Sequence, residues 1–305
     1  MSQNPLTHLY RKKSLYVALP SKGKYYKDGI ELSVDEELGV LPMTTADEIK
    51  LKSPDALFNG EAMFDMLVSC VPDIKNPKEI PACDLDVLLF AIKIATTGDE
   101  LAITSQCPHC EGTHDYAASL PHILSTAKEI DDDNIVRLDD NTEVHVRPYT
   151  LESQIKTNIK QFHNYRMEAI LNQGEELSIE SKTELFNSAL ASASQITIQL
   201  LADNILKVII RDENDKKIIV DESKHIYEWV QNMSSEVYKK LVDRIKLLSD
   251  PQIQSDLTIT CHGCSKEYKT NIDLDPVSFF TWGQWGWALR SSKLIQINLL
   301  PSKKE

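Results

Sequence analysis

Six cysteines occur in this chain of 305 residues, and four of them form two Cys-x-x-Cys pairs, Cys107-Pro-His-Cys110 and Cys261-His-Gly-Cys264. A Cys-x-x-Cys turn can present two thiolates to one metal ion, because backbone amides of the turn also stabilise the charge on sulfur. Each pair supplies half of a tetrahedral site, and residues 111–260 separate the two pairs. We therefore predict one structural zinc ion with four ligands: Cys107, Cys110, Cys261 and Cys264.

Two alternatives compete with a shared metal site. The cysteines could be buried free thiols, or each pair could be a redox-active dithiol of the thioredoxin type. A thioredoxin-type pair opens a helix after a strand, and no helical pattern follows either pair here. A site of four thiolates has no open coordination position, so we predict a structural and not a catalytic zinc. Because four cysteines satisfy the metal, we interpret three nearby histidines as exposed: His109, His114 and His262.

Short strand patterns flank both cysteine pairs in the same way. Leu101–Thr104 leads into the first pair, and Thr113–Tyr116 leads out of it. Leu257–Thr260 and Glu267–Thr270 repeat this arrangement around the second pair. Each pair is therefore predicted to be a zinc knuckle at the tip of a β-hairpin. Together the hairpins predict a split zinc ribbon with a large helical insertion between its two knuckles.

We divide the chain into four segments of an α+β protein. Residues 1–43 form a β-rich N-terminal part, and residues 44–123 combine a helical hairpin with the first knuckle. Residues 124–254 form a mainly helical insertion with β-hairpins, and residues 255–305 hold the second knuckle and an aromatic tail. Outside the knuckles, the predicted helices and strands are Ser14–Leu19, Leu38–Leu41, Glu61–Val71, Asp84–Thr97, Val136–Leu138, Thr142–Arg147, Leu151–Leu171, Ser181–Leu206, Val208–Ile210, Ile218–Val220, His225–Gln231 and Glu236–Leu248.

The composition restricts the classes of partner. The formal charge of -13 and the isoelectric point near 5.1 argue against nucleic acid or an anionic membrane, because either would repel the protein at long range. The first twenty residues lack the apolar core of a signal peptide, and no apolar stretch is long enough to span a bilayer. We expect the chain to stay where it is made, in a reducing compartment such as the cytoplasm.

No catalytic set is visible in the sequence. The chain contains no GxxxxGK[ST], GxGxxG, GxSxG or HExxH motif, which removes the commonest phosphate-binding, nucleophile and metalloprotease sites. The acidic run Asp131-Asp132-Asp133 lacks the spaced donors of an EF-hand loop, and we interpret it as a solvated loop. Cys70 and Cys83 lie on apolar helix faces, where a thiol behaves as a small hydrophobe. We predict that the protein is not an enzyme.

Two segments are candidates for contact with other proteins. Trp282, Trp285 and Trp287 either cover the zinc ribbon or form a docking surface, since aromatic residues dominate both cores and interfaces. We predict contact surfaces in the residues before Lys24 and in Phe279–Leu289, which combine exposed chain position with apolar or aromatic content.

The run from Leu15 to Cys110 resembles the baseplate hub proteins of T-even-type contractile-tailed phages. The similarity consists of several blocks in the same order. These are LPSKGKYY (Leu19–Tyr26), LPMTTADE (Leu41–Glu48), SPDALFNGEA (Ser53–Ala62), SCVPDI (Ser69–Ile74), DLDVLLFAI (Asp84–Ile92) and CPHC (Cys107–Cys110).

This resemblance implies a structural or assembly protein at the centre of a phage baseplate, made in the host cytoplasm and located in the virion tail. It implies contacts with the trimeric hub protein, with tail-tube proteins and with the tape measure protein, in a trimer or a multiple of it. It implies no enzyme activity. Two rival functions are a zinc-ribbon adaptor for another macromolecule, such as nucleic acid, and a cell-wall hydrolase carried in the hub, which would need a cleft with paired carboxylates or histidine.

Overall fold

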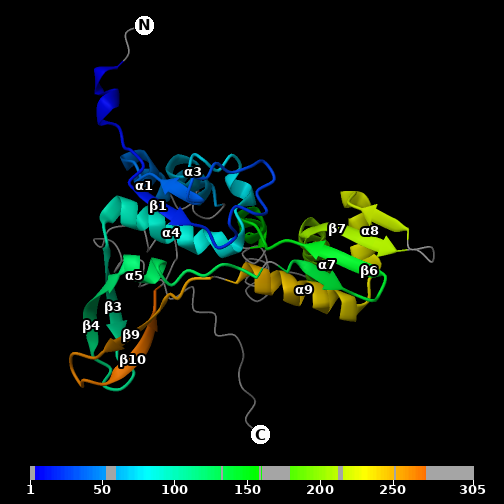
Figure 1. Ribbon diagram of the computed structural model, residues 1–305. Coiled ribbons are helices and arrows are strands. Elements are labelled where there is room, and N and C mark those ends of the chain that lie inside the picture. Colours follow the sequence, from blue (N-terminus) through cyan, green and yellow to red (C-terminus); the bar gives the residue numbers. More distant parts are fainter. Residues whose placement is uncertain are drawn as a thin grey trace.

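The computed structural model describes residues 4–52, 60–131, 133–157, 159, 179–211, 216–250 and 252–272, which form a mixed α+β fold (Figure 1). Up to residue 124 the elements are η1 (Pro5–Leu9), β1 (Leu15–Ala18), β2 (Glu37–Val40), α1 (Thr45–Leu51), α3 (Glu61–Cys70), η2 (Pro77–Glu79), α4 (Ala82–Thr97), β3 (Glu100–Gln106), β4 (Thr113–Ser119) and α5 (Leu120–Leu124). The later elements are β5 (Ile135–Arg137), β6 (Thr142–Val146), α7 (Ile179–Asp203), β7 (Ile205–Arg211), β8 (Lys217–Val220), α8 (Ser223–Asn232), α9 (Ser235–Ser249), β9 (Asp256–Thr260) and β10 (Glu267–Asn271). Residues 151–157 are also helical. Within the described ranges, no helix is both long enough and apolar enough to cross a membrane.

The first hydrophobic core surrounds helix α4, whose residues are buried on nearly every side. Phe90, at its centre, has no exposed surface. The antiparallel pair β1 and β2 packs against this helix and places Val17 opposite Leu38, with both side chains buried. Ile253 and Ile272 belong to the same core, although they lie more than 150 residues further along the chain than α4. The N-terminal strands, the central helix and the returning chain are therefore one packed unit.

A buried carboxylate ties the N-terminal loop to helix α4. Asp84 lies in the first turn of α4 and is fully buried. Its oxygens accept hydrogen bonds from the backbone N–H of Ser21 (2.8 Å), the Ser21 hydroxyl (2.5 Å) and the Tyr26 hydroxyl (2.9 Å). Ser21 and Tyr26 belong to the LPSKGKYY block, and Asp84 begins the DLDVLLFAI block. Two blocks that are distant in sequence therefore meet at one hydrogen-bonded cluster.

A second core lies in the insertion, under the antiparallel sheet β5-β6-β7-β8. A row of valines crosses all four strands, because the register pairs Val136 with Val144, Val144 with Val208, and Val208 with Val220. Helices α8 and α9 contact this sheet and contribute the remaining apolar side chains of the core. The apolar residues that alternate along the strands thus pack against the apolar faces of the amphipathic helices.

The end of helix α7 differs from the prediction. The sequence pattern is helical up to Leu206, but α7 ends at Asp203 and β7 starts at Ile205. The side-chain amide of Asn204 donates to the carbonyl of Leu200 (2.6 Å), and the next residue pairs with β6. Pairing with an existing strand overrides the helical preference of the local sequence.

The insertion leaves and rejoins the first unit at neighbouring points. The N–H of Lys128 donates to the carbonyl of Gln252 (2.8 Å), and the N–H of Gln254 donates to the Thr126 hydroxyl (2.9 Å). These bonds join the outgoing and returning chains side by side (Figure 1). The insertion is therefore accommodated without separating the chain segments that precede and follow it.

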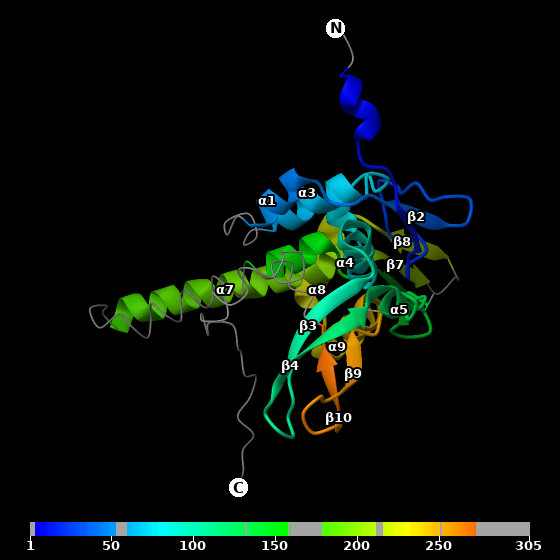
Figure 2. The ribbon, with the colours of Figure 1, turned by 90° about the vertical axis from the view of Figure 1, so that its left-hand side faces the viewer.

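Beyond α4, two β-hairpins extend together from the first core (Figures 1 and 2). In β3-β4 and in β9-β10, inward residues alternate with exposed ones. The inward side chains of the two hairpins meet, as shown by the hydrogen bond from the Ser105 hydroxyl to Thr270 Oγ1 (3.1 Å). The two hairpins thus stack on one another, and each carries a cysteine pair at its outer end.

The remaining predictions for helices and strands agree with the structure within a few residues at each boundary. For the predicted helix Leu151–Leu171, residues 151–157 and 159 are described and helical, and the rest lies outside the described residues. Phe279–Leu289, with its three tryptophans, also lies outside them.

Candidate metal centre

The first cysteine turn is fixed by its own backbone. The N–H of Cys107 donates to the carbonyl of Gly112 (2.9 Å), and the N–H of Glu111 donates back to the carbonyl of Cys107 (2.9 Å). Glu111 takes a positive φ of 59°, which closes the turn. The N–H of His109 points at Cys107 Sγ (3.4 Å). A backbone donor therefore stabilises negative charge on this sulfur.

The second turn repeats this pattern. The N–H of Cys261 donates to the carbonyl of Lys266 (2.9 Å), and the N–H of Ser265 donates to the carbonyl of Cys261 (2.9 Å). Ser265 has a φ of 58°, and the N–H of Gly263 lies 3.3 Å from Cys261 Sγ. The two turns therefore have the same conformation, although their intervening residues differ.

The structure brings all four sulfurs of the two turns together. Cys107 Sγ lies 3.7 Å from Cys264 Sγ, and Cys110 Sγ lies 3.6 Å from Cys261 Sγ. All four sulfur atoms lie within 4.8 Å of one another. A tetrahedral ion with metal–sulfur bonds of about 2.3 Å requires sulfur–sulfur edges of about 3.8 Å. The four cysteines could therefore hold one metal ion with little change in their positions.

The charge state of these thiols fits binding of a cation. In the absence of metal, the N–H of Cys264 and then that of Gly263 lower the pKa of Cys261, to about 6, although partial burial opposes this. For Cys110 the N–H of Gly112 lowers the pKa, but the neighbouring thiols, first that of Cys261, raise it to about 12. One thiolate is thus favoured, and further ionisation within the cluster is opposed by its neighbours. A bound divalent cation would favour ionisation of the remaining thiols, because the metal takes the place of their protons.

The sulfurs are enclosed unequally. Cys107 and Cys261 are buried and form a small apolar cluster with Tyr268. Cys264 is half-buried, and Cys110 is the exposed member of the set. The site therefore lies at the tip of the stacked hairpins, with Cys110 as its exposed residue.

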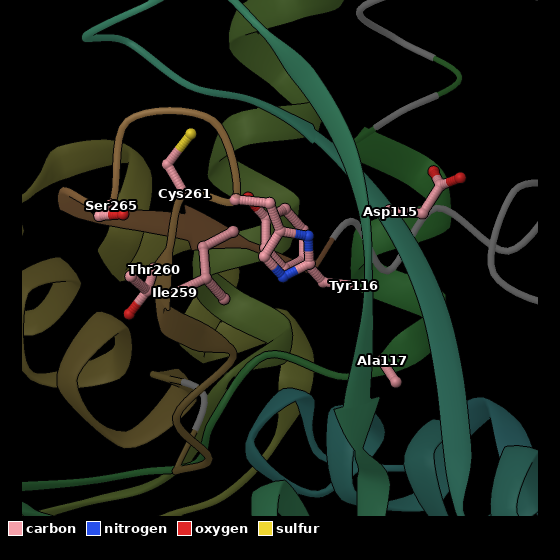
Figure 3. Close-up of a pocket in the computed structure, with 8 residues that line it drawn as sticks. Asp115, Tyr116, Ala117, Ile259, Thr260, Cys261 and Ser265 are labelled. Atoms are coloured by element: carbon pink, nitrogen blue, oxygen red, sulfur yellow. The ribbon is translucent and has the colours of Figure 1, made fainter.

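A shallow groove of about 560 Å³ lies beside the second turn (Figure 3). Its lining includes Tyr116 and His262, whose ring centres are 4.8 Å apart. Asp115 stands on the far side of the groove from Cys261 in Figure 3, and its carboxylate accepts a hydrogen bond from the Thr104 hydroxyl (2.7 Å). Among the described residues, the four cysteines are the only group with the geometry of a metal site.

One histidine differs from the prediction. His109 and His262 are exposed, as expected, but the ring of His114 is partly buried and its Nε2 is fully buried. The alternation in β4 is the signal that could have shown this, because it places His114 on the same inward face as Tyr116. The other two cysteines are buried free thiols, as predicted; burial raises the pKa of Cys70 to about 12.

Comparison with known proteins gives one match. The protein-family model described as "T4 bacteriophage base plate protein" matches residues 15–281, which is most of the chain. Neither the curated proteins nor the solved structures contain a significant match. The match includes the central helix α4, both cysteine turns and the whole insertion between them.

Proposed function

The chain belongs to the family of T4 bacteriophage base plate proteins, and on this premise we propose that it is an assembly component of the central hub of the baseplate. Membership makes it a phage baseplate protein and a component of the virion tail. A structural function of this kind needs no catalytic residues. The placement in the hub is supported by the six sequence blocks between Leu19 and Cys110, which resemble baseplate hub proteins.

We further propose that the ion held by Cys107, Cys110, Cys261 and Cys264 is zinc, and that the stacked hairpins form a split zinc ribbon. Four thiolates are the typical donor set of structural zinc, and the sulfur–sulfur distances of 3.6 and 3.7 Å suit its tetrahedron. A zinc ion in this position would supply a closed cross-link worth on the order of 10 kcal/mol. The chain's own residues orient the sulfurs through the backbone hydrogen bonds of the two turns.

The cross-link would hold together segments on either side of the insertion. The four proposed segments are residues 1–43, 44–123, 124–254 and 255–305. The insertion supplies a separate surface built on its own core. A clamp at the hairpin tips would keep the two halves of the first unit in register while both units contact other baseplate proteins.

The N-terminal arm, residues 4–10, is the contact surface that the described structure supports best. Its short helix η1 buries no residue, and Leu6, Leu9 and Tyr10 are 58%, 70% and 61% exposed. The arm stands away from the rest of the molecule in both views (Figures 1 and 2). Three neighbouring apolar side chains that are each more than half exposed are suited to an apolar groove on a partner.

Arg11 anchors the base of this arm. Its guanidinium donates to the carbonyl of Pro42, to the carbonyl of Ser69 (2.7 Å) and to the Ser69 hydroxyl (2.6 Å). It also lies 3.5 Å from the Asp47 carboxylate. The direction in which the arm leaves the body is therefore fixed, which lowers the entropy cost of docking.

We propose the trimeric hub protein and the tail-tube proteins as partners, with the end of the tape measure protein as a further contact. The chain is proposed to act as a homo-oligomer, a trimer or a multiple of it, to match the symmetry of the hub. Phe279–Leu289 is proposed as a second contact surface on the basis of its aromatic sequence.

The test is reconstitution from purified proteins of the same phage. The full chain, mixed with the hub protein and a tail-tube protein, should co-elute with them in size-exclusion chromatography, with masses read by light scattering. A Leu6→Ala, Leu9→Ala double variant should weaken this complex, whereas Val34→Ala, at a fully exposed site outside the arm, should not. Failure of the full chain to bind either protein would contradict placement in the hub. Equal binding by both variants would exclude the N-terminal arm as a contact surface.

A further inference from the structure

His114 carries a buried nitrogen that has no hydrogen-bond partner. Its Nε2 is inaccessible to solvent, and no described residue donates to it or accepts from it. Leaving such a group unpaired costs roughly 1–3 kcal/mol, so buried ring nitrogens normally have a partner. A nearby group that becomes a strong acceptor only when metal is bound would satisfy it.

The buried nitrogen lies between the two cysteine turns. A Cβ atom added at Gly112, in the first turn, would lie 3.0 Å from His114 Nε2 and 3.5 Å from Cys110 Sγ. A Cβ atom added at Gly263, in the second turn, would lie 3.1 Å from the same nitrogen and 3.7 Å from the same sulfur. The imidazole edge and the Cys110 sulfur therefore border the same space, which stays open because both turns have glycine there.

Cys110 is the most exposed of the four ligand residues, and a further donor beside the N–H of Gly112 would stabilise its thiolate. Cys107 and Cys261 are buried, and each faces the N–H of the residue two positions later, at 3.4 and 3.3 Å. Cys110 is exposed. Four thiolates around a divalent ion leave a net charge of about −2, which N–H donors to sulfur stabilise.

We propose that His114 is a positioning residue of the metal centre, whose Nε2–H donates a hydrogen bond to the Cys110 thiolate when metal is bound. This inference rests on the proposed four-cysteine site. It assigns the neutral tautomer with the proton on Nε2 and leaves Cys110, not His114, as the ligand. The bond satisfies the buried nitrogen and stabilises the thiolate of the exposed residue Cys110.

The experiment compares metal affinity in the full-length protein and three variants, by titration with Co²⁺ in competition with a chelator. His114→Phe fills the space without a donor, whereas His114→Gln places an amide N–H near the position of Nε2. His109→Phe changes an exposed side chain in the first turn and is the matched control. We expect His114→Phe to bind metal about 10–100-fold more weakly, as loss of an outer-shell partner does, with His114→Gln recovering much of the loss and the control unchanged.

Several results would overturn the inference. Equal affinity of His114→Phe and the unmodified protein would show that the ring only fills space, and equally weak binding by Gln and Phe would exclude a donor role. A Co²⁺ spectrum with a nitrogen ligand that survives in Cys110→Ser would make His114 a ligand instead. In ¹⁵N spectra of the unmodified protein with zinc, a protonated Nε2 is expected, and an unprotonated one contradicts the proposal without any variant. If the unmodified protein binds neither Co²⁺ nor Zn²⁺, the four-cysteine site itself fails.

Discussion

Replacing Tyr26 by phenylalanine removes one of the hydrogen bonds that the buried Asp84 carboxylate accepts. The Tyr26 hydroxyl donates to Asp84 at 2.9 Å, and both residues are buried. Burial raises the pKa of Asp84 from 3.8 to about 6, although hydrogen bonds from Ser21, Tyr26 and Cys83 oppose the rise. The charged form at neutral pH thus costs about 3 kcal/mol relative to the unfolded chain. The charged carboxylate is therefore stabilised by the groups that donate hydrogen bonds to it.

The pH dependence follows from the raised pKa. Below about pH 4 the Asp84 carboxyl is protonated in both the folded and the unfolded state, so its full contribution to stability is present. As pH rises through about 6 the folded state must release the proton, and this contribution is lost. Without the Tyr26 hydroxyl, the charged form loses a bond worth about 1.5–3 kcal/mol, but the protonated form loses only about 0.5–1.5 kcal/mol. The destabilisation by Tyr26→Phe should therefore be larger at high pH.

The assay is urea unfolding followed by circular dichroism, at about pH 8 and about pH 5, on each side of the Asp84 pKa. Tyr16→Phe is the matched control, because that side chain is 50% exposed on β1. We expect Tyr26→Phe to lower the free energy of unfolding by roughly 2–3 kcal/mol at the higher pH and by roughly 1 kcal/mol at the lower, with the control near zero. Equal losses at both pH values would refute the argument that Asp84 is charged in the folded state.

Three further substitutions test other local features. Gly60→Ala should destabilise the protein by roughly 2–3 kcal/mol, because Gly60 has a φ of 77° and the added Cβ would lie 2.7 Å from the Ile155 side chain. A loss of only about 1 kcal/mol in urea unfolding, the cost of the left-handed backbone alone, would contradict the contact. Arg11→Ala should lower the free energy of unfolding by about 1–2 kcal/mol, because the hydrogen bonds of the guanidinium are lost. A loss near zero in urea unfolding would show that Arg11 does not anchor the arm. Ser265→Gly should raise stability by roughly 0.5–1 kcal/mol by relieving a positive φ, and any decrease in melting temperature would argue against strain there.

The local parts of the metal centre could be predicted from sequence because they depend on short spacing. A Cys-x-x-Cys turn between two short strands specifies its own hairpin, and the second copy specifies another. The two turns have the same conformation as each other, including a positive φ at Glu111 and at Ser265. Their meeting in space across a long insertion was predicted only from the similarity of the two turns, and it depends on the packing of the first core.

Features set by contacts between distant segments could not be predicted in this way. The alternation in β4 could show that His114 points inward, but not that Gly263 of the second hairpin would lie beside its buried Nε2. Ile205 and Leu206 continue a helical pattern, and they enter a strand because β6 is present to pair with them. The cluster around Asp84 was likewise not visible, because its donors lie about 60 residues away in a loop.

The metal content of the purified full-length protein, measured by elemental analysis, tests the proposed clamp. The same measurement on a Cys261→Ser, Cys264→Ser variant shows whether the two turns share one ion. We predict one zinc ion per chain in the unmodified protein, and loss of both the zinc and much of the stability in the variant. Absence of metal from the unmodified protein, or retention of zinc by the variant, would contradict a site shared between the two turns.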